Sequence, residues 1–213
     1  NVFIIDNDHY RQTLRGYISS SEVMNIPYGA EIDYSIFELD RNLIDEFSFI
    51  NKPYVLSISR SIADNKIYEL CNHFSQRSDI HCVVISNFTN SEYGKAVLSR
   101  FKGSDNLTLI DGLYDKSKLD FIRRNCRTYI HTHTLCGSAP SLIEMIACKV
   151  PIMSIDVAQN QFTLKGECLY FSDFNELYEI DFHSNLDCYK PSDVLAKSYN
   201  WDRVIADYER ALY

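Results

Sequence analysis

The stretch that decides the fold is residues 129–152, which read YIHTHTLCGSAPSLIEMIACKVPI. A short apolar run ends at His131, a loop of small residues follows, a segment of helical length begins at Pro140, and a second apolar run starts at Pro151. Proline is favourable in the first turn of a helix because its missing N–H has no helical partner there. The stretch therefore predicts a strand, a helix and a second strand, which is the repeating unit of a parallel α/β sheet.

The same alternation runs through most of the chain from residue 53 onward. Short apolar runs that predict buried strands lie at residues 53–58, 82–85, 107–110, 128–131, 151–155 and 168–171. Segments with apolar residues three or four apart, which predict helices, lie at residues 66–76, 91–101, 117–125, 140–148 and 160–165. We predict an α/β fold with a Rossmann-like parallel sheet of about six strands flanked by helices.

The two ends of the chain depart from this regular alternation. Strands are predicted at 2–6 and 23–26, and helices at 9–18, 43–47, 193–199 and 201–212. One strand–helix–strand piece cannot make a core by itself. Together with a start on Asn1 rather than methionine, this suggests a fragment of a longer protein.

Composition and charge exclude several classes of protein. With 213 residues, 46% of them hydrophobic, the chain has material for one folded domain or slightly more. Its formal charge of −8 argues against a general nucleic-acid-binding surface, so we expect no nucleic-acid partner. We expect a cytoplasmic protein because no apolar run reaches the ~20 residues that cross a bilayer, no secretory signal is present, and seven cysteines contain no C-x-x-C pair.

Spacing excludes several common catalytic motifs. No two glycines lie two apart, which removes the G-x-G-x-x-G dinucleotide turn, and none fits the G-x-x-x-x-G-K phosphate loop. The sequence has no H-E-x-x-H pair and no G-x-S-x-G elbow. We therefore expect no cofactor.

The loop before the predicted helix 140–148 is the first candidate binding site. Its small residues Gly137, Ser138 and Ala139 let a ligand approach the backbone, and the first N–H groups of the helix carry the positive end of its dipole. This arrangement is typical of a phosphate-binding site. Glu144 lies one turn into the helix on a mostly apolar segment, where it either binds a partner such as ribose hydroxyls or faces solvent.

The loop after the predicted strand 53–58 is the second candidate site. It carries Arg60, and Lys66 stands at the start of the next predicted helix. Doubly wound sheets bind ligands at the carboxyl ends of their strands, where a guanidinium can hold a diphosphate through two hydrogen bonds. A surface salt bridge is the ordinary alternative for such residues. By contrast, Arg123, Arg124 and Arg127 read as a solvated helix face.

Two patterns could in principle bind a metal ion. His131 and His133 lie two apart at a strand end and would point to one face, but a third ligand is not found nearby in the sequence. Asp6 and Asp8 have the D-x-D form that some metal-dependent nucleotide-sugar enzymes use, yet a strand end followed by a helix cap is the favoured interpretation. We therefore predict no metal site.

Taken in this order, these residues resemble the C-terminal half of a family 4 glycosyltransferase of the GT-B architecture, over nearly all of the chain. The matching pieces are IPYGA at 26–30, the Arg60 loop, SLIEMIAC at 141–148 with Pro151, and YNWD at 199–202. The His-x-His strand end and the loop after it resemble the subgroup that builds bacterial polysaccharides. Two positions depart from the family. Cys136 stands where a glutamate often holds sugar hydroxyls, and Lys66 follows Arg60 by six residues rather than five.

The resemblance implies a retaining transfer from a nucleotide diphosphate sugar without an obligatory metal. In that reaction Arg60, with Lys66, would offset charge on the departing diphosphate. The residues that the resemblance assigns to donor binding are Arg60, Tyr114 near the base, His133, Gly137, Ser138, Ala139, Pro140, Ser141, Leu142, and Glu144 on the ribose.

The resemblance also implies a domain organisation. Residues 1–30 would be a remnant of an N-terminal acceptor domain, 31–52 a linker, 53–190 the nucleotide-sugar-binding domain, and 191–213 the helices that cross back. The acceptor-binding half would then be missing, and we expect this fragment to be inactive alone.

The leading hypothesis is the donor-binding half of a hexosyltransferase that uses UDP-hexose or UDP-N-acetylhexosamine, with dTDP-rhamnose as the second choice of donor. Its acceptor would be a glycan or lipid-linked glycan of O-antigen, in lipopolysaccharide, or of capsule. Peripheral association of the full-length protein with the inner face of the cell membrane is left open. The alternative hypothesis is a non-catalytic nucleotide-sugar-binding module.

Overall fold

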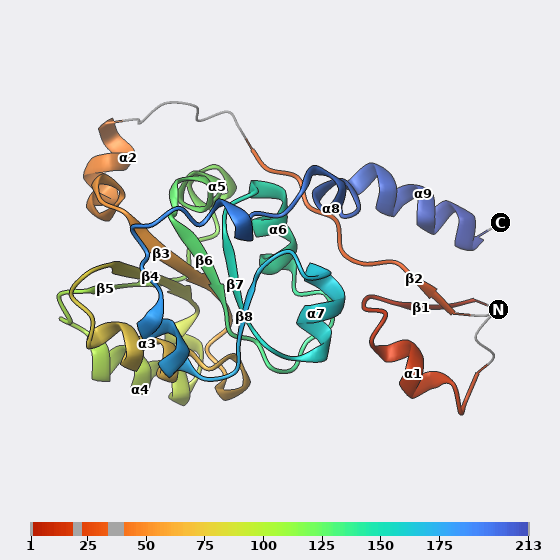
Figure 1. The fold of residues 1–213 in the computed structure, drawn as a ribbon, viewed down its shortest axis with the longest axis horizontal. Coiled ribbons are helices and arrows are strands. Elements are labelled where there is room, and N and C mark those ends of the chain that lie inside the picture. Colours follow the sequence, from red (N-terminus) through yellow and green to blue (C-terminus); the bar gives the residue numbers. More distant parts are fainter. Residues whose placement is uncertain (1, 19–22, 34–40, 213) are drawn as a thin grey trace.

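A sheet of six parallel strands forms the centre of the computed structural model, which describes residues 2–18, 23–33 and 41–212 (Figure 1). In chain order the strands are β3 (Tyr54–Ile58), β4 (His81–Ser86), β5 (Leu107–Asp111), β6 (Thr128–His131), β7 (Ile152–Ile155) and β8 (Leu169–Phe171). Each neighbouring pair is parallel, and the spatial order is β5-β4-β3-β6-β7-β8. The predicted Rossmann-like sheet is confirmed.

Helices cover both faces of this sheet. The crossover helices are α3 (Ile67–Ser75), α4 (Glu92–Phe101), α5 (Lys116–Asn125), α6 (Pro140–Cys148) and α7 (Ala158–Leu164). Helices α3 and α4 lie on one face, and α5 and α6 lie on the other (Figure 1). Because side chains alternate along a strand, Leu56 of β3 packs in the core on the side of α5 and α6, while its neighbour Val55 packs with Leu70 and Phe74 of α3.

The order of the strands reverses direction between β3 and β6. From β3 the chain moves outward through β4 to β5, returns to β6, and then moves outward on the other side through β7 to β8. In open α/β sheets, ligands bind at the carboxyl ends of the strands beside such a switch point. The topology therefore points to the loops that follow β3 and β6.

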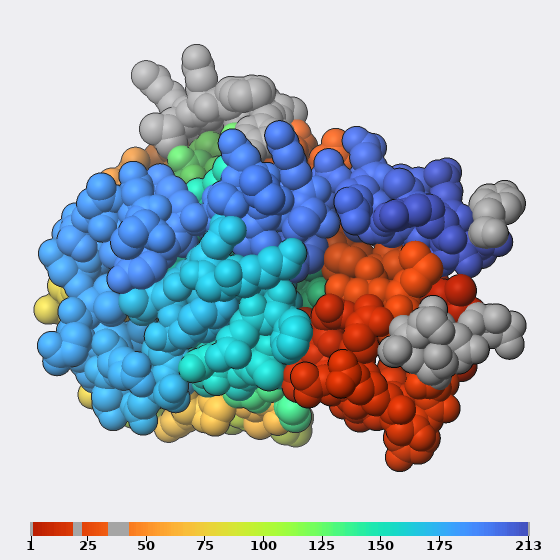
Figure 2. All heavy atoms as spheres, turned by 45° about the vertical axis from the view of Figure 1, so that its right-hand side comes forward, coloured from red at the N-terminus to blue at the C-terminus, as the bar shows by residue number. Residues whose placement is uncertain are grey.

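The N-terminal segment forms a small unit beside the main sheet. It contains β1 (Phe3–Ile5), α1 (Tyr10–Leu14) and β2 (Val23–Asn25), and β1 pairs in parallel with β2. In Figure 2 this red segment packs between α7 and the C-terminal helix α9 (Trp201–Leu212). The side chain of Asn7 donates hydrogen bonds to the carbonyl of Gln159 at 3.0 Å and to the hydroxyl of Thr163 at 3.1 Å, both on α7.

The remaining elements connect these two units. Residues 41–51 form α2 (Arg41–Glu46) and a 3₁₀ helix (Ser48–Asn51), where the sequence predicts a helix at 43–47. Part of the predicted linker, residues 34–40, lies outside the described residues. The other elements are α8 (Asp193–Lys197) and the 3₁₀ helices Ala63–Asn65, Phe88–Asn90, Phe174–Glu179 and Asp187–Tyr189. None of the helices in the described ranges has both the length and the hydrophobicity that a membrane span needs.

Candidate functional site

A hollow of about 470 Å³ opens at the carboxyl ends of β3 and β6, at the topological switch point. Its lining residues come from the ends of four neighbouring strands and the start of α6: Ile58, Ser59, Arg60, Ile85, Ser86, Asn87, Gly112, Leu113, Tyr114, His133, Cys136, Ala139, Pro140 and Ser141. The structure thus brings together Arg60, Tyr114, His133, Ala139, Pro140 and Ser141 of the predicted site. The lining does not include Lys66, Gly137, Ser138, Leu142 or Glu144.

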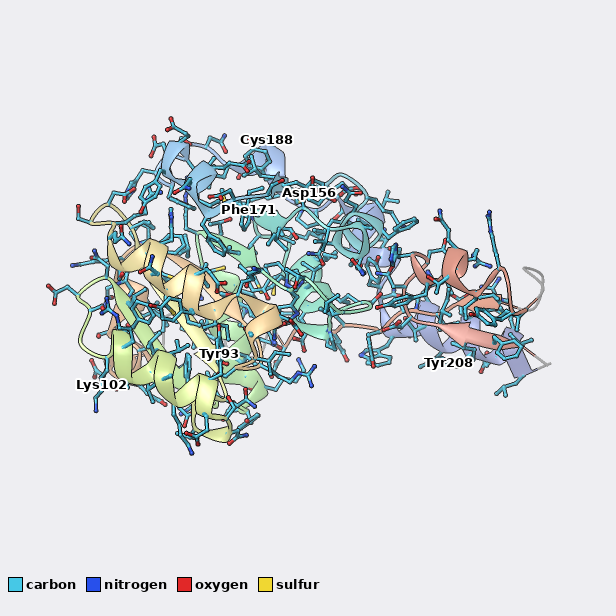
Figure 3. All side chains as sticks on the ribbon, turned by 90° about the horizontal axis from the view of Figure 1, so that it is seen from below. Tyr93, Lys102, Asp156, Phe171, Cys188 and Tyr208 are labelled. Atoms are coloured by element: carbon cyan, nitrogen blue, oxygen red, sulfur yellow. The ribbon has the colours of Figure 1, made fainter. Side chains whose placement is uncertain are left out.

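A second hollow of similar size lies between the N-terminal segment and α9. It measures about 480 Å³, and Tyr208 of α9, labelled in Figure 3, lines it together with Ile4 and Tyr28. Asp6 is the only charged residue among those that line it. A hollow with a single carboxylate does not suit an anionic ligand. The hollow at the switch point is the candidate site because Arg60 borders it and because ligands of open α/β sheets bind at that place.

The backbone around Arg60 is held firmly against the end of β4. The N–H of Ser59 donates to the carbonyl of Ile85 at 3.1 Å, and the N–H of Ser61 donates to the side chain of Asn87 at 2.9 Å. The buried side chain of Asn65 donates to the carbonyl of Arg60 at 2.8 Å. These bonds fix the loop while the Arg60 side chain stays exposed at the hollow.

Lys66 lies apart from this hollow. Its backbone adopts the left-handed conformation, with φ of 54°, at the junction between a 3₁₀ helix and α3. Its Nζ lies 3.7 Å from a carboxylate oxygen of Glu69, one turn further along the chain. Asn65, which stands five residues after Arg60, supports the Arg60 loop instead of supplying a cation.

The start of α6 supplies backbone amides to the hollow. Pro140 is the first helical residue, as predicted, and no side chain caps the helix. The N–H of Leu142 donates to the carbonyl of Ala139 at 3.0 Å. Within the part of the chain that the structure describes, no protein acceptor is found for the amides of Ala139 and Ser141, and both residues line the hollow. An anion placed there would meet unpaired N–H groups and the positive end of the helix dipole.

Asp6, immediately after β1, contacts the loop that precedes α6. Its carboxylate accepts a hydrogen bond from the N–H of Ser138 at 3.3 Å, and its carbonyl accepts one from the Ser138 hydroxyl. A Cβ on Gly137 would overlap the Asp6 carboxylate, so glycine permits this close approach. Asp8 instead pairs with Arg11 at 2.9 Å. The two carboxylates of the D-x-D pattern therefore have separate protein partners, and Asp6 places a negative charge beside the candidate phosphate loop.

Glu144 is part of an ion-pair network between α5 and α6. The guanidinium of Arg123 bonds the carboxylate of Glu144 and also that of Asp120, the latter at 2.7 Å, and Lys116 contacts the other oxygen of Asp120 at 2.5 Å. Burial raises the pKa of Glu144, although the charge of Arg123 opposes that shift. Arg123 is only 3% exposed, so the predicted solvated face is wrong for this residue.

Gly112 and Tyr114 form the rim that follows β5. The φ of Gly112 is +68°, and its N–H donates to the carbonyl of Ser86 at 2.8 Å. A Cβ on Gly112 would lie 3.0 Å from the ring of Tyr114. Both the backbone conformation and the nearby ring therefore favour glycine. Tyr114 is 82% exposed, which leaves its ring free to stack on a flat ligand.

Two histidines and a cysteine meet where β6 ends. Burial holds the pKa of His131 well below its ordinary value, with the charge of His133 adding to this and Asn160 opposing it. Burial also lowers the pKa of His133 to about 4, and the charge of Arg60 adds to the effect. Burial raises the pKa of Cys136 to about 11, with Asp6 adding and Arg60 opposing. At neutral pH the cluster therefore consists of two neutral imidazoles and a thiol.

Several residues that line the hollow are not among the predicted site residues, and Asn87 and Cys136 are two of them. Asn87 lies directly after β4, one residue beyond the end of its strand, and Arg60 lies two residues beyond the end of β3. The rule that ligands bind at carboxyl ends of strands could have identified it. Cys136, which the resemblance marks only as a departure from the glycosyltransferase pattern, is one of the residues that line the hollow.

No protein-family model and no curated protein matches this chain, but solved structures do. The sucrose-phosphate synthase of Thermosynechococcus elongatus matches with a TM-score of 0.74 and 18% identity, over 98% of this chain and 57% of its own. Anabaena HepE in complex with UDP and glucose matches with a TM-score of 0.72 and 10% identity. The match covers 99% of this chain and 62% of HepE. The lipopolysaccharide outer core galactosyltransferase WaaB matches with a TM-score of 0.65 and 10% identity. The match covers 99% of this chain and 61% of WaaB.

These matches define the class of fold. At such identities the likeness shows a shared architecture, and that architecture is one Rossmann-like half of the GT-B glycosyltransferase fold. The chain spans between 57% and 62% of the length of these three structures. The likeness therefore covers only part of each of these proteins and does not by itself show an activity of the whole protein.

Proposed function

We propose that this chain is the donor-binding half of a glycosyltransferase that uses a nucleotide diphosphate sugar. The observation that carries the proposal is that Arg60 and the uncapped start of α6 border one hollow at the switch point of the sheet. A guanidinium and unpaired helix amides are the groups that bind a diphosphate. The complex of HepE with UDP and glucose supports this choice of ligand.

We further propose roles for individual residues in a retaining, family 4 type of transfer. Arg60 would offset the charge that develops on the leaving diphosphate, and the exposed ring of Tyr114 would lie against the base. Lys66 is the second candidate cation. Because its Nζ lies beside Glu69, we expect Lys66→Ala to weaken donor binding less than Arg60→Ala does. Glu144 would bind the ribose while remaining paired with Arg123.

The donor and the biological setting are also proposals. We propose UDP-hexose or UDP-N-acetylhexosamine as donor, with dTDP-rhamnose second, and a glycan or lipid-linked glycan of O-antigen or capsule as acceptor. The likeness to WaaB, whose name includes lipopolysaccharide, supports this setting. The acceptor would be bound by a further domain, to which residues 1–30 would belong, in a cytoplasmic protein.

Titration calorimetry of this chain with UDP tests the proposal. We expect binding at one site, and we expect Arg60→Ala to weaken it roughly tenfold or more because a charge-assisted hydrogen bond is lost. Arg100→Ala is the matched control, since Arg100 lies in the last turn of α4 and is not among the residues that line the hollow. Absence of UDP binding, or equal effects of the two variants, would contradict the proposal.

The alternative function is a nucleotide-sugar-binding module without transferase activity. The observation that favours it is Cys136, which occupies the hollow where a sugar-binding carboxylate is common in the resembling family. The two functions differ in an assay of the full-length protein with UDP-glucose and UDP-N-acetylglucosamine. Transfer or donor hydrolysis that Arg60→Ala abolishes supports the enzyme, and binding without turnover supports the module.

A further inference from the structure

Three potential metal ligands converge at the end of β6. One ring nitrogen of His131, one ring nitrogen of His133 and the sulfur of Cys136 all lie within 4.8 Å of one another. Among the described residues, this is the only group of three or more His, Cys, Asp or Glu side chains arranged in this way. The expectation that a third ligand is lacking near the two histidines is therefore wrong, because the loop after β6 turns Cys136 back toward them.

The two imidazoles have nitrogen atoms without partners. His131 is 1% exposed. The Nε2 atoms of His131 and His133 are both buried and make no hydrogen bond of normal geometry, although the Asn160 side chain interacts with the His131 ring. A buried polar nitrogen without a partner is unfavourable, so two at one place call for an explanation. The other nitrogen of His131, Nδ1, lies 3.5 Å from the hydroxyl of Tyr129, so Nε2 is the nitrogen that can bind a metal ion.

The loop that carries Cys136 is attached to its surroundings on both sides. Before the cysteine, the N–H and the hydroxyl of Thr134 both donate to the carbonyl of Asp64, at 3.0 and 2.8 Å. After it, Ser138 bonds to Asp6. The side chain of Asn160 donates to the carbonyl of His133 at 3.1 Å. The backbone thus holds the three ligands in place, and small side-chain rotations are enough to bring their donor atoms together.

We propose that His131, His133 and Cys136 form a binding site for a single Zn²⁺ ion. Imidazole nitrogen and thiolate sulfur are both ligands that zinc binds, with bonds of about 2.0 Å to nitrogen and about 2.3 Å to sulfur. A tetrahedral ion of that size needs its ligand atoms roughly 3.5 Å apart, which the cluster reaches with shifts of about 1 Å. On binding, the Cys136 thiol loses its proton to solvent and the sulfur donates an electron pair to the metal.

In this site the fourth coordination position of the ion is open and faces the hollow. His133 and Cys136 both line that hollow, whereas His131 lies behind them in the sheet. Three protein ligands with one open position are typical of zinc sites that bind a water molecule or a ligand oxygen. The carboxylate of Asp6, which lies against Gly137, offsets part of the positive charge that the ion brings beside Arg60.

Cobalt substitution gives a direct test that does not depend on transferase activity. The purified chain is freed of metal by a chelator under reducing conditions and titrated with Co²⁺. We expect the visible bands of tetrahedral cobalt and a thiolate-to-cobalt charge-transfer band, which saturate at one equivalent and disappear when Zn²⁺ is added. Equilibrium dialysis with elemental analysis should likewise give one Zn²⁺ per chain.

Matched variants separate this site from adventitious metal. Cys136→Ala should abolish the charge-transfer band and weaken Zn²⁺ binding at least tenfold. His133→Ala should weaken Zn²⁺ binding to a similar extent. Cys168→Ala changes another half-buried cysteine and should leave both measurements unchanged. Circular dichroism checks that each variant folds, and His133 is chosen before His131 because His131 is fully enclosed in the sheet. Binding below one equivalent, or a charge-transfer band that survives Cys136→Ala, would overturn the proposal.

Discussion

The guanidinium of Arg123 on α5 bonds the carboxylate of Glu144 on α6, and the same guanidinium bonds Asp120 at 2.7 Å. Glu144, which the resemblance to glycosyltransferases would assign to the ribose, is therefore also a structural link between two helices. Any role of Glu144 in binding a ligand has to be compatible with this ion pair.

Replacing Arg123 should destabilise the protein strongly. Arg123→Met leaves the buried carboxylate of Asp120 paired with Lys116 and hydrogen-bonded to the N–H of Asp33, and it removes the guanidinium that pairs with Glu144. Removal of one partner from a buried ion pair costs about 3 to 5 kcal/mol, so we expect the free energy of unfolding to fall by roughly 3 kcal/mol. Urea denaturation measures this change. Arg100→Met on the exposed side of α4 should change it by less than ~0.5 kcal/mol, and a similar loss in both variants would contradict the interpretation.

The buried histidine His73 should make the protein less stable in mild acid. Burial lowers its pKa from 6.5 to about 4, with the charge of Arg77 adding and that of Asp79 opposing. Between these two values the unfolded chain binds a proton at this residue and the folded chain does not. The free energy of unfolding therefore falls as the pH decreases through this window, by up to roughly 3 kcal/mol from this group.

The variant His73→Phe tests whether His73 causes this loss of stability at low pH. The ring of His73 packs against those of Phe74 and Tyr178, so phenylalanine preserves the aromatic contacts without a titrating group. We expect the variant to lose less stability than the wild type between pH 7 and pH 4, measured by urea denaturation at each pH. At pH 8 both proteins carry a neutral ring at this position, and the comparison there gives the packing effect alone. An unchanged pH dependence would refute the assignment.

Removing the charge of Asp6 should strengthen UDP binding. The carboxylate of Asp6 accepts from the N–H of Ser138 in the candidate phosphate loop, so it repels an incoming diphosphate. Asp6→Asn keeps an acceptor oxygen and removes the charge, and we expect UDP to bind roughly twofold to tenfold more tightly at low salt. Asp8→Asn is the control, because Asp8 pairs with Arg11. Calorimetry at two salt concentrations should show that the gain shrinks with salt, and weaker binding in Asp6→Asn would count against the role.

Two glycines with similar backbone conformations provide a matched test of the rim. Gly112 and Gly103 have φ values of 68° and 88°, so alanine should cost each position roughly 1 kcal/mol of stability. A Cβ on Gly112 would also crowd the ring of Tyr114, while one on Gly103 would enter open space. We expect Gly112→Ala to weaken UDP binding severalfold and Gly103→Ala to leave it unchanged. Equal affinities in the two variants would show that the Tyr114 rim does not contribute.

Much of the fold could be predicted because its signals are local. The strand ending at Ile58 and the helix starting at Pro140 follow from short apolar runs and the chemistry of one proline, and both appear in the structure. The position of Arg60 at a ligand-binding edge follows from the parallel sheet itself. The direction of the Lys66 side chain does not follow from the apolar pattern, because it depends on the left-handed backbone conformation of Lys66 itself.

The sequence by itself determined the order of strands and helices and the loops that end at one edge of the sheet, because periodicity and turn residues act over a few neighbours. Only the tertiary structure decided which charged and polar groups meet. It buried Arg123 between Asp120 and Glu144, placed Asp6 on Ser138 across 132 residues of chain, and turned Cys136 toward two histidines. Such contacts depend on how whole elements pack, and a charged side chain looks the same in the sequence whether its partner is water or another residue.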